Sequence, residues 1–136
     1  MQSPATHPTN QNVEVTVSHA WTLFTVKNEI CRNDIVQAID AHFPNLASVD
    51  VIWDLSEASL AAMNRADFEA IAIATKKHEA KRQDARTVFV SSNPETFAAI
   101  CMYTGIAALA EMTVDYSAFS TLEEGERWLV CNRKHK

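Results

Sequence analysis

Two kinds of hydrophobic periodicity alternate along this chain. Near the N-terminus, Val13, Val15 and Val17 alternate with polar residues, and this period is typical of a half-buried β-strand. After a short polar break, Trp21–Val26 predicts a second strand, and two strands joined so closely form an antiparallel hairpin. Three later segments predict further strands: Val49–Leu55, Arg86–Ser91 and Thr113–Phe119.

Four helices are predicted between and after these strands. The first begins near Asn33, which can cap a helix N-terminus, and ends at Pro44. The second spans about residues 64–81, and the last begins at a capping box formed by Thr121 and Glu124. The order is therefore β-β-α-β-α-β-α-β-α, which predicts right-handed crossovers. We expect one α/β domain with a mixed five-stranded sheet and an N-terminal antiparallel hairpin.

The third predicted helix has almost no polar face. Asn93, Pro94 and Glu95 give it a cap, a proline in the first turn and a carboxylate near the positive end of the helix dipole. From Thr96 to Ala110 the sequence contains no charged residue, so apolar side chains cover nearly the whole circumference. A small sheet covers only one side of such a helix. We expect the other side to lie in a homodimer interface, formed by Ala99, Met102, Tyr103, Ile106 and Leu109.

Length, charge and cysteine content bear on the number of domains, the class of partner and the cellular compartment. The chain has 136 residues, the size of one domain, and we expect residues 1–12 to be a disordered tail, 13–131 the domain and 132–136 a charged tail. The net charge of −5 argues against nucleic-acid binding. We expect cytoplasmic localisation, with no signal peptide and no membrane span, and three reduced, buried cysteines. We interpret one basic cluster as a solvated helix end: Lys76, Lys77, Lys81, Arg82 and Arg86.

Glycine and histidine positions exclude several kinds of catalytic site. The only two glycines, Gly105 and Gly125, both fall inside predicted helices. Phosphate-binding loops and the nucleophile elbow of hydrolases need glycine at tight turns, so neither is encoded here. No two histidines have the spacing that places two metal ligands on one helix face. We therefore expect no metal and no cofactor.

Polar residues follow two of the predicted parallel strands. Asp54 and Ser56 come at the end of one strand, and Ser91, Ser92 and Asn93 come at the end of the next. Ligands of open α/β sheets bind beyond the carboxyl ends of the strands, so these five residues are candidates for a polar ligand site. The alternative is that they fix a loop and cap a helix. An enzyme built on them would need a carboxylate with a perturbed pKa in a cleft.

Three segments carry a resemblance to a known family: VIWDLSEASLAAMNRADFEAI, RTVFVSSNPETFAAICMYTGIA and AFSTLEEGERWLV. Their common features are an Asp-Leu at the end of a buried strand, a strand that ends at a capped helix, and an E-x-x-x-W-L helix. In these features the chain resembles the SpoIIAA-like family of STAS/SEC14-type proteins over about residues 13–130. The resemblance implies a βα superhelical fold and a non-catalytic role in binding a protein partner or a small apolar ligand.

The same resemblance bears on regulation. Members of the wider superfamily are anti-sigma factor antagonists that switch by phosphorylation of a serine at the start of the helix after a D-L-S strand. Asp54, Leu55 and Ser56 match that strand, but the phosphoacceptor region falls at residues 62–65, where there is no serine or threonine. We therefore expect a regulatory module without the usual serine phospho-switch. The alternative is a carrier or sensor of a lipid or other hydrophobic small molecule, which requires an enclosed apolar cavity.

Overall fold

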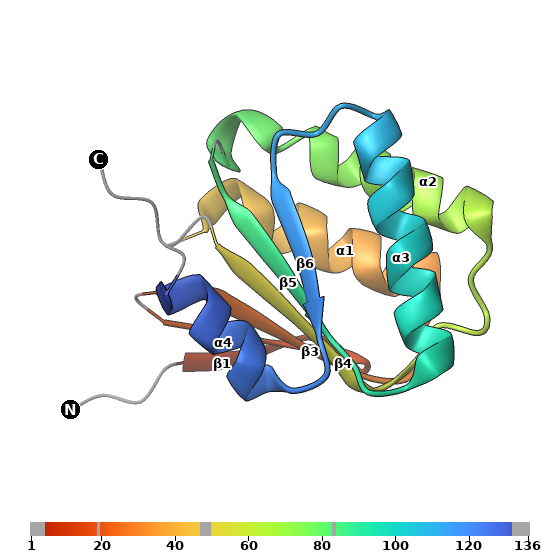
Figure 1. The fold of residues 1–136 in the computed structure, drawn as a ribbon, viewed down its shortest axis with the longest axis horizontal. Helices are drawn as coiled ribbons and strands as arrows, with labels where there is room; N and C mark the ends of the chain where they lie inside the picture. Colours follow the sequence, from red (N-terminus) through yellow and green to blue (C-terminus); the bar gives the residue numbers. More distant parts are fainter. Residues whose placement is uncertain (1–4, 19, 47–49, 83, 132–136) are drawn as a thin grey trace.

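The computed structural model describes residues 5–18, 20–46, 50–82 and 84–131. They form one six-stranded mixed sheet with four α-helices (Figure 1). The strands lie in chain order across the sheet: β1 (Ala5–Asn10), β2 (Val13–Val17), β3 (Thr22–Glu29), β4 (Val51–Ser59), β5 (Arg86–Val90) and β6 (Asp115–Phe119). The helices are α1 (Arg32–His42), α2 (Arg65–Lys76), α3 (Pro94–Leu109) and α4 (Leu122–Cys131), with short 3-10 helices η1 (Phe43–Asn45) and η2 (Glu79–Arg82).

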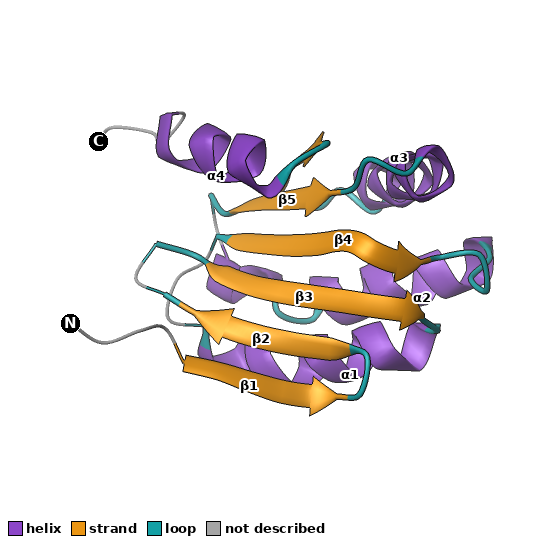
Figure 2. Cartoon of the chain, turned by 90° about the horizontal axis from the view of Figure 1, so that it is seen from below, coloured by secondary structure: helices purple, strands orange, loops and turns teal. Residues whose placement is uncertain are grey.

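The sheet has an antiparallel half and a parallel half. β1, β2 and β3 pair antiparallel, whereas β3, β4, β5 and β6 pair parallel. The crossover helices α1, α2 and α3 cover one face of the sheet, and α4 covers part of the other face (Figure 2). The predicted α/β class, the four α-helices and the antiparallel N-terminal hairpin are therefore confirmed.

The sheet contains one strand more than the sequence predicts. β1 pairs with β2, with a register shift between Pro8 and Asn10. The expected tail over residues 1–12 is therefore wrong for residues 5–10. β1 lies at an edge of the sheet, where a proline is tolerated because one side of the strand has no ladder to complete. Residues 1–4 and 132–136, also predicted as tails, lie outside the described residues.

β4 continues past its predicted end at Leu55. In its pairing with β3, Thr25 lies opposite Asp54 but Lys27 lies opposite Glu57, so β4 holds one extra residue between these pairs. Such a bulge lets a strand continue with a local kink. Asp54 and Ser56 therefore lie inside β4 at an irregular position, and not at the end of the strand as predicted.

Two hydrophobic cores lie on opposite faces of the sheet. Phe89 of β5 packs in the larger core under α1, α2 and α3, whereas its neighbours Val88 and Val90 pack in the smaller core under α4. α4 comes so close to β5 that a Cβ at Gly125 would lie 2.6 Å from a methyl carbon of Val88. Glycine at this position therefore permits the helix–sheet contact.

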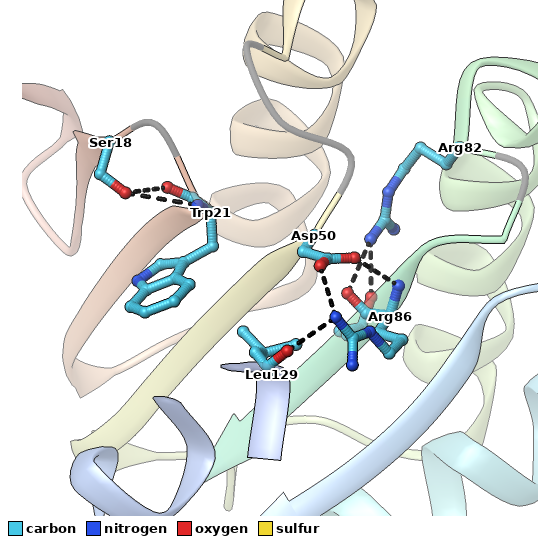
Figure 3. Close-up of polar contacts among 7 residues, drawn as sticks. Ser18, Trp21, Asp50, Arg82, Arg86 and Leu129 are labelled. Atoms are coloured by element: carbon cyan, nitrogen blue, oxygen red, sulfur yellow. Dashed lines mark hydrogen bonds and ion pairs between the residues drawn. The ribbon is translucent and has the colours of Figure 1, made fainter. Parts of the chain in front are cut away.

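A buried ion pair joins these layers at the N-terminal ends of β4 and β5 (Figure 3). Asp50 Oδ2 lies 3.1 Å from Arg86 Nη2, and Asp50 Oδ1 accepts a hydrogen bond of 3.0 Å from the Arg86 backbone N–H. Arg86 Nη2 also donates to the carbonyl of Leu129 in α4 at 2.8 Å. The Arg86 guanidinium carbon is 5.4 Å from the ring centre of Trp128. One side chain thus connects β4, β5 and α4.

Asp50→Asn should destabilise the fold strongly, because it leaves the Arg86 charge buried without its carboxylate. We expect a loss of about 3–5 kcal/mol in the free energy of unfolding, measured by urea denaturation. Glu123→Gln is the matched control, since Glu123 pairs with Arg127 at 3.2 Å on the surface. That exposed pair should contribute only about 0–1 kcal/mol. Similar losses for both variants would contradict a structural role for Asp50.

Candidate functional site

The predicted polar site divides into two separate hydrogen-bonded groups. In the first, Asp54 Oδ1 accepts a hydrogen bond of 2.6 Å from the Ser56 hydroxyl and one of 3.1 Å from the Ser56 backbone N–H. This oxygen is thereby engaged within the strand itself. Neither residue is among those lining the hollow beyond β5.

The second group closes the end of β5 and opens α3. The hydroxyl oxygen of Ser91, which is buried, accepts a hydrogen bond of 3.1 Å from the Asn93 backbone N–H. Asn93 Oδ1 accepts from the backbone N–H groups of Glu95 and Thr96 at 2.8 and 3.4 Å, which makes it the predicted helix cap. Ser91 and Ser92 also border an open hollow. The capping interpretation therefore accounts for the contacts of Ser91 and Asn93.

The predicted interface residues of α3 fall on different sides of the helix. Tyr103 and Ile106 are buried in the core, and Ala99 is half-buried and lines an interior cavity. Met102 and Leu109 face outward, with 47% and 78% of their surface exposed. We call the exposed side of the helix the outer α3 face, which consists of Ala98, Cys101, Met102, Gly105, Ala108 and Leu109.

The outer α3 face carries no charged side chain, and Gly105 lies near its middle. A Cβ built at Gly105 would meet no atom within 4 Å, so packing inside the chain does not require glycine there. In a helix interior, glycine is about 1 kcal/mol less favourable than alanine. Any steric benefit of the missing side chain at Gly105 must therefore come from a contact with another molecule.

The three cysteines are exposed, which corrects the expectation that they are buried. Cys101 lies on the outer α3 face, one position after the buried Ile100. Cys31 is the N-cap of α1 in place of the predicted Asn33, and its thiol lies 3.6 Å from Asp34 Oδ2. Cys101 lies at the surface because the inward positions of α3 next to it are taken by Ile100 and Tyr103.

β6 is an edge strand next to α3. It is the last strand of the sheet, so among the described strands it pairs only with β5. Natural edge strands are protected from pairing with other chains by lysine, proline or bulges. β6 contains no lysine and no proline, and its one charged residue is Asp115 at the start of the strand. α3 lies beside β6 in the structure (Figure 1).

An interior cavity lies between the sheet and the three crossover helices. Its volume is about 60 Å³. At roughly 24 cal/mol per Å³, a void of this size costs about 1.4 kcal/mol when empty. An engineered cavity that holds benzene measures about 150 Å³, so this one is too small for a lipid chain. This cavity therefore does not provide the apolar space that the lipid-carrier alternative requires.

Polar groups gather at one end of this cavity. Arg82 Nη2 donates to the Thr87 hydroxyl at 2.9 Å and to the Arg86 carbonyl at 3.4 Å. The Arg82 guanidinium carbon lies 5.0 Å from the ring centre of Phe43. Burial lowers the pKa of Arg82 to about 10. Arg82 and Arg86 are thus buried, so the interpretation of their segment as a solvated helix end is wrong for both. Their hydrogen-bond partners come from other parts of the folded chain, which a local sequence pattern does not reveal.

Two tyrosines line the same cavity. Tyr103 donates to the Thr75 hydroxyl at 3.4 Å, and the rings of Tyr103 and Tyr116 meet edge to face with their centres 5.8 Å apart. Burial raises the pKa of Tyr103 and that of Tyr116 above the ordinary value of 10.0. Tyr103 was predicted at the interface, and Tyr116 was predicted only as part of a strand, so the sequence indicated no shared site for them.

No protein-family model matches this chain, and no curated protein matches it. In the part of the chain that the structure describes, no group of three or more His, Cys, Asp and Glu side chains could hold a metal ion. None of the described helices combines the length and the apolarity needed to cross a membrane. The outer α3 face and the interior cavity are therefore the features from which function is inferred.

The tyrosine environment predicts a distinctive alkaline titration. Tyr103 and Tyr116 are the only tyrosines, so the phenolate absorbance of the chain reports on the cavity alone. Because both pKa values are raised in the folded state, little phenolate should form at pH 10, where a free tyrosine is half ionised. The stability linked to these groups is complete below pH 10 and is lost as the pH rises towards their folded-state pKa values. Half ionisation near pH 10 in a folded sample would contradict their burial.

Proposed function

We propose that this chain is a non-enzymatic, SpoIIAA/STAS-like binding and regulatory module that acts through protein–protein contacts as a homodimer. The observation that carries this proposal is the outer α3 face, an exposed apolar helix surface without charge. Contiguous exposed apolar surface on a folded chain marks interaction sites. Met102 and Leu109 are two of the four large apolar side chains that the described part of the chain exposes.

Gly105 supports a close contact between helices. Its lack of a side chain allows another backbone to approach the helix, and the chain itself makes no use of that space. The small residues Ala98 and Ala108 lie on either side of it along the same face. A second helix crossing near Gly105 would bury Met102 and Leu109 at its flanks.

A second copy of this chain suits the face better than an unrelated partner. A two-fold axis brings the same patch of both protomers together, so an apolar face is matched by an apolar face. The chain has a net charge of −5, yet no charge lies between Thr96 and Ala110 to oppose its own copy. If the two-fold axis is perpendicular to α3, the two helices run antiparallel, which sets their dipoles in a favourable direction.

Two features support the family assignment and the absence of the phospho-switch. The parallel strands β3 to β6 follow one another in the sheet with their crossover helices on one face, as expected of a βα superhelix. At the start of α2, Asn64 occupies the N-cap position and its side chain accepts from the Asp67 backbone N–H. The region that the resemblance assigns to the phosphoacceptor, residues 62–65, thus includes a capping asparagine.

Met102→Glu should dissociate the dimer, because the substitution places two like charges at a symmetric contact. Ile73→Glu is the matched control, since Ile73 is 67% exposed but lies on α2 and is not part of the outer α3 face. In sedimentation velocity at micromolar concentrations, we expect the natural chain and Ile73→Glu to sediment as dimers. Met102→Glu should sediment as a monomer, with the dissociation constant raised about a hundredfold. A natural chain that stays monomeric, or equal dissociation of both variants, would refute the proposed interface.

Gly105→Ala separates stability from association. In the dissociated chain the added methyl meets nothing, so alanine should raise the free energy of unfolding by about 0.5–1 kcal/mol through its helix propensity. In the dimer the same methyl separates the crossing helices, so the dissociation constant should rise about tenfold. Chemical denaturation at low concentration and sedimentation at high concentration measure the two effects. An unchanged dissociation constant would exclude a helix crossing at Gly105.

A further inference from the structure

An open hollow lies beyond the carboxyl ends of β5 and β6. The connection after β5 leads to α3 on one face of the sheet, whereas the connection after β6 leads to α4 on the other face (Figure 1). Ligands of open α/β sheets bind in the crevice where such connections diverge from the strand ends. The hollow has a volume of about 400 Å³ and is lined by Ser91, Ser92, Pro94, Phe97, Ala98 and Ser120. Small-molecule sites measure about 300–1,000 Å³, so the size suits one.

Ser91 brings a buried hydroxyl group to the lining of this hollow. The residue is fully buried, and its oxygen accepts the Asn93 backbone N–H at 3.1 Å. None of the described groups of the chain accepts the hydroxyl proton of Ser91 in return. A buried donor without an acceptor costs free energy, and a ligand oxygen in the hollow would remove that cost. Ser92 and Ser120 add two hydroxyl groups at exposed positions.

The charges around the hollow select a neutral ligand. Among the described residues, no charged side chain lines it. An anion at a helix N-terminus binds to free backbone N–H groups. Pro94 has none, and Asn93 Oδ1 already accepts those of Glu95 and Thr96. Glu95 also places an exposed carboxylate in the first turn of α3, which disfavours an anion.

The rest of the lining is apolar. The ring of Phe97 is half-buried, and Pro94 and Ala98 lie exposed beside it in the same lining. Sites with apolar walls and a few hydroxyl groups bind molecules that have both an apolar surface and hydrogen-bonding groups. A pyranose ring has apolar C–H faces and carries hydroxyl groups around its edge. Each of these groups can donate and accept, as the serine hydroxyls do.

We propose that this hollow binds a neutral pyranose sugar, with one face of the ring against Phe97 and its hydroxyl groups at Ser91, Ser92 and Ser120. A sugar oxygen accepts the proton of Ser91, and the apolar face of the ring covers Phe97. Inorganic phosphate and other anions suit the hollow less well, because no cation lines it and the first-turn N–H groups of α3 are occupied. The proposal goes beyond the dimer and does not depend on it.

Ligand charge gives the first test. The probes are the methyl glycosides of glucose, galactose and mannose, and the control for each is its uronate form, which carries a carboxylate on the same ring. Titrations at millimolar concentrations, followed by backbone amide chemical shifts, should show saturable changes at Ser92, Phe97 and Ser120 with at least one glycoside. Its uronate should bind at least about tenfold more weakly, equivalent to about 1.4 kcal/mol. No saturable shift at these residues with any glycoside, or equal affinities for a glycoside and its uronate, would overturn the proposal.

Filling the hollow gives the second test. Ala98→Leu adds volume at an exposed position of the lining and should weaken glycoside binding by at least about tenfold. Ala108→Leu is the matched control, since it makes the same change at an exposed position of the outer α3 face but outside the lining. It should bind the glycoside like the natural chain. Met102→Glu should also retain binding, which distinguishes failure of this proposal from failure of the dimer. Undiminished binding by Ala98→Leu, or an equal loss in Ala108→Leu, would overturn the hollow as the site.

Discussion

The carboxylate of Asp50 is the contact on which the arrangement of both layers depends. It binds the backbone and the side chain of Arg86, and the same guanidinium holds α4 through the Leu129 carbonyl. On the other face of the sheet, Arg82 donates to the Arg86 carbonyl and to Thr87. The N-terminal ends of β4 and β5 are thus joined to α4 on one side and to the large core on the other. Because these charges are buried, any change in their number costs far more than a change at the surface.

The two sides of α3 differ in role: its inner side packs in the core, and its outer face is the surface to which we assign a function. Ile100, Tyr103 and Ile106 fix α3 to the core, so the direction of its outer face is set by packing. Met102, Gly105 and Leu109 make no comparable contribution inside the chain, and we propose that a partner helix covers them. The cavity lies under the same helix, and Ala99 and Tyr103 belong to its wall. The proposed interface and the cavity therefore share α3.

The sequence predicted those features that depend on local patterns. Alternation identified β2 and β6, and the caps at Asn93 and Thr121 were correctly placed because capping uses neighbouring residues. β1 was missed because its polar composition resembles a tail and its pairing depends on β2. The bulge in β4 was missed because it depends on the register with β3. Periodicity could not separate the two sides of α3, since the helix is apolar all round, and the burial of Arg82 and Arg86 follows only from tertiary contacts.

The most direct test of the central claim measures whether the outer α3 face is covered in solution. Substitution of Cys31 and Cys131 by serine leaves Cys101, on that face, as the only thiol. The rate at which an alkylating reagent labels Cys101 can then be followed as the protein concentration is raised. A rate that falls as the dimer forms is the result predicted here. A fast rate that stays the same at every concentration would show that the face remains open to water and would contradict the homodimer.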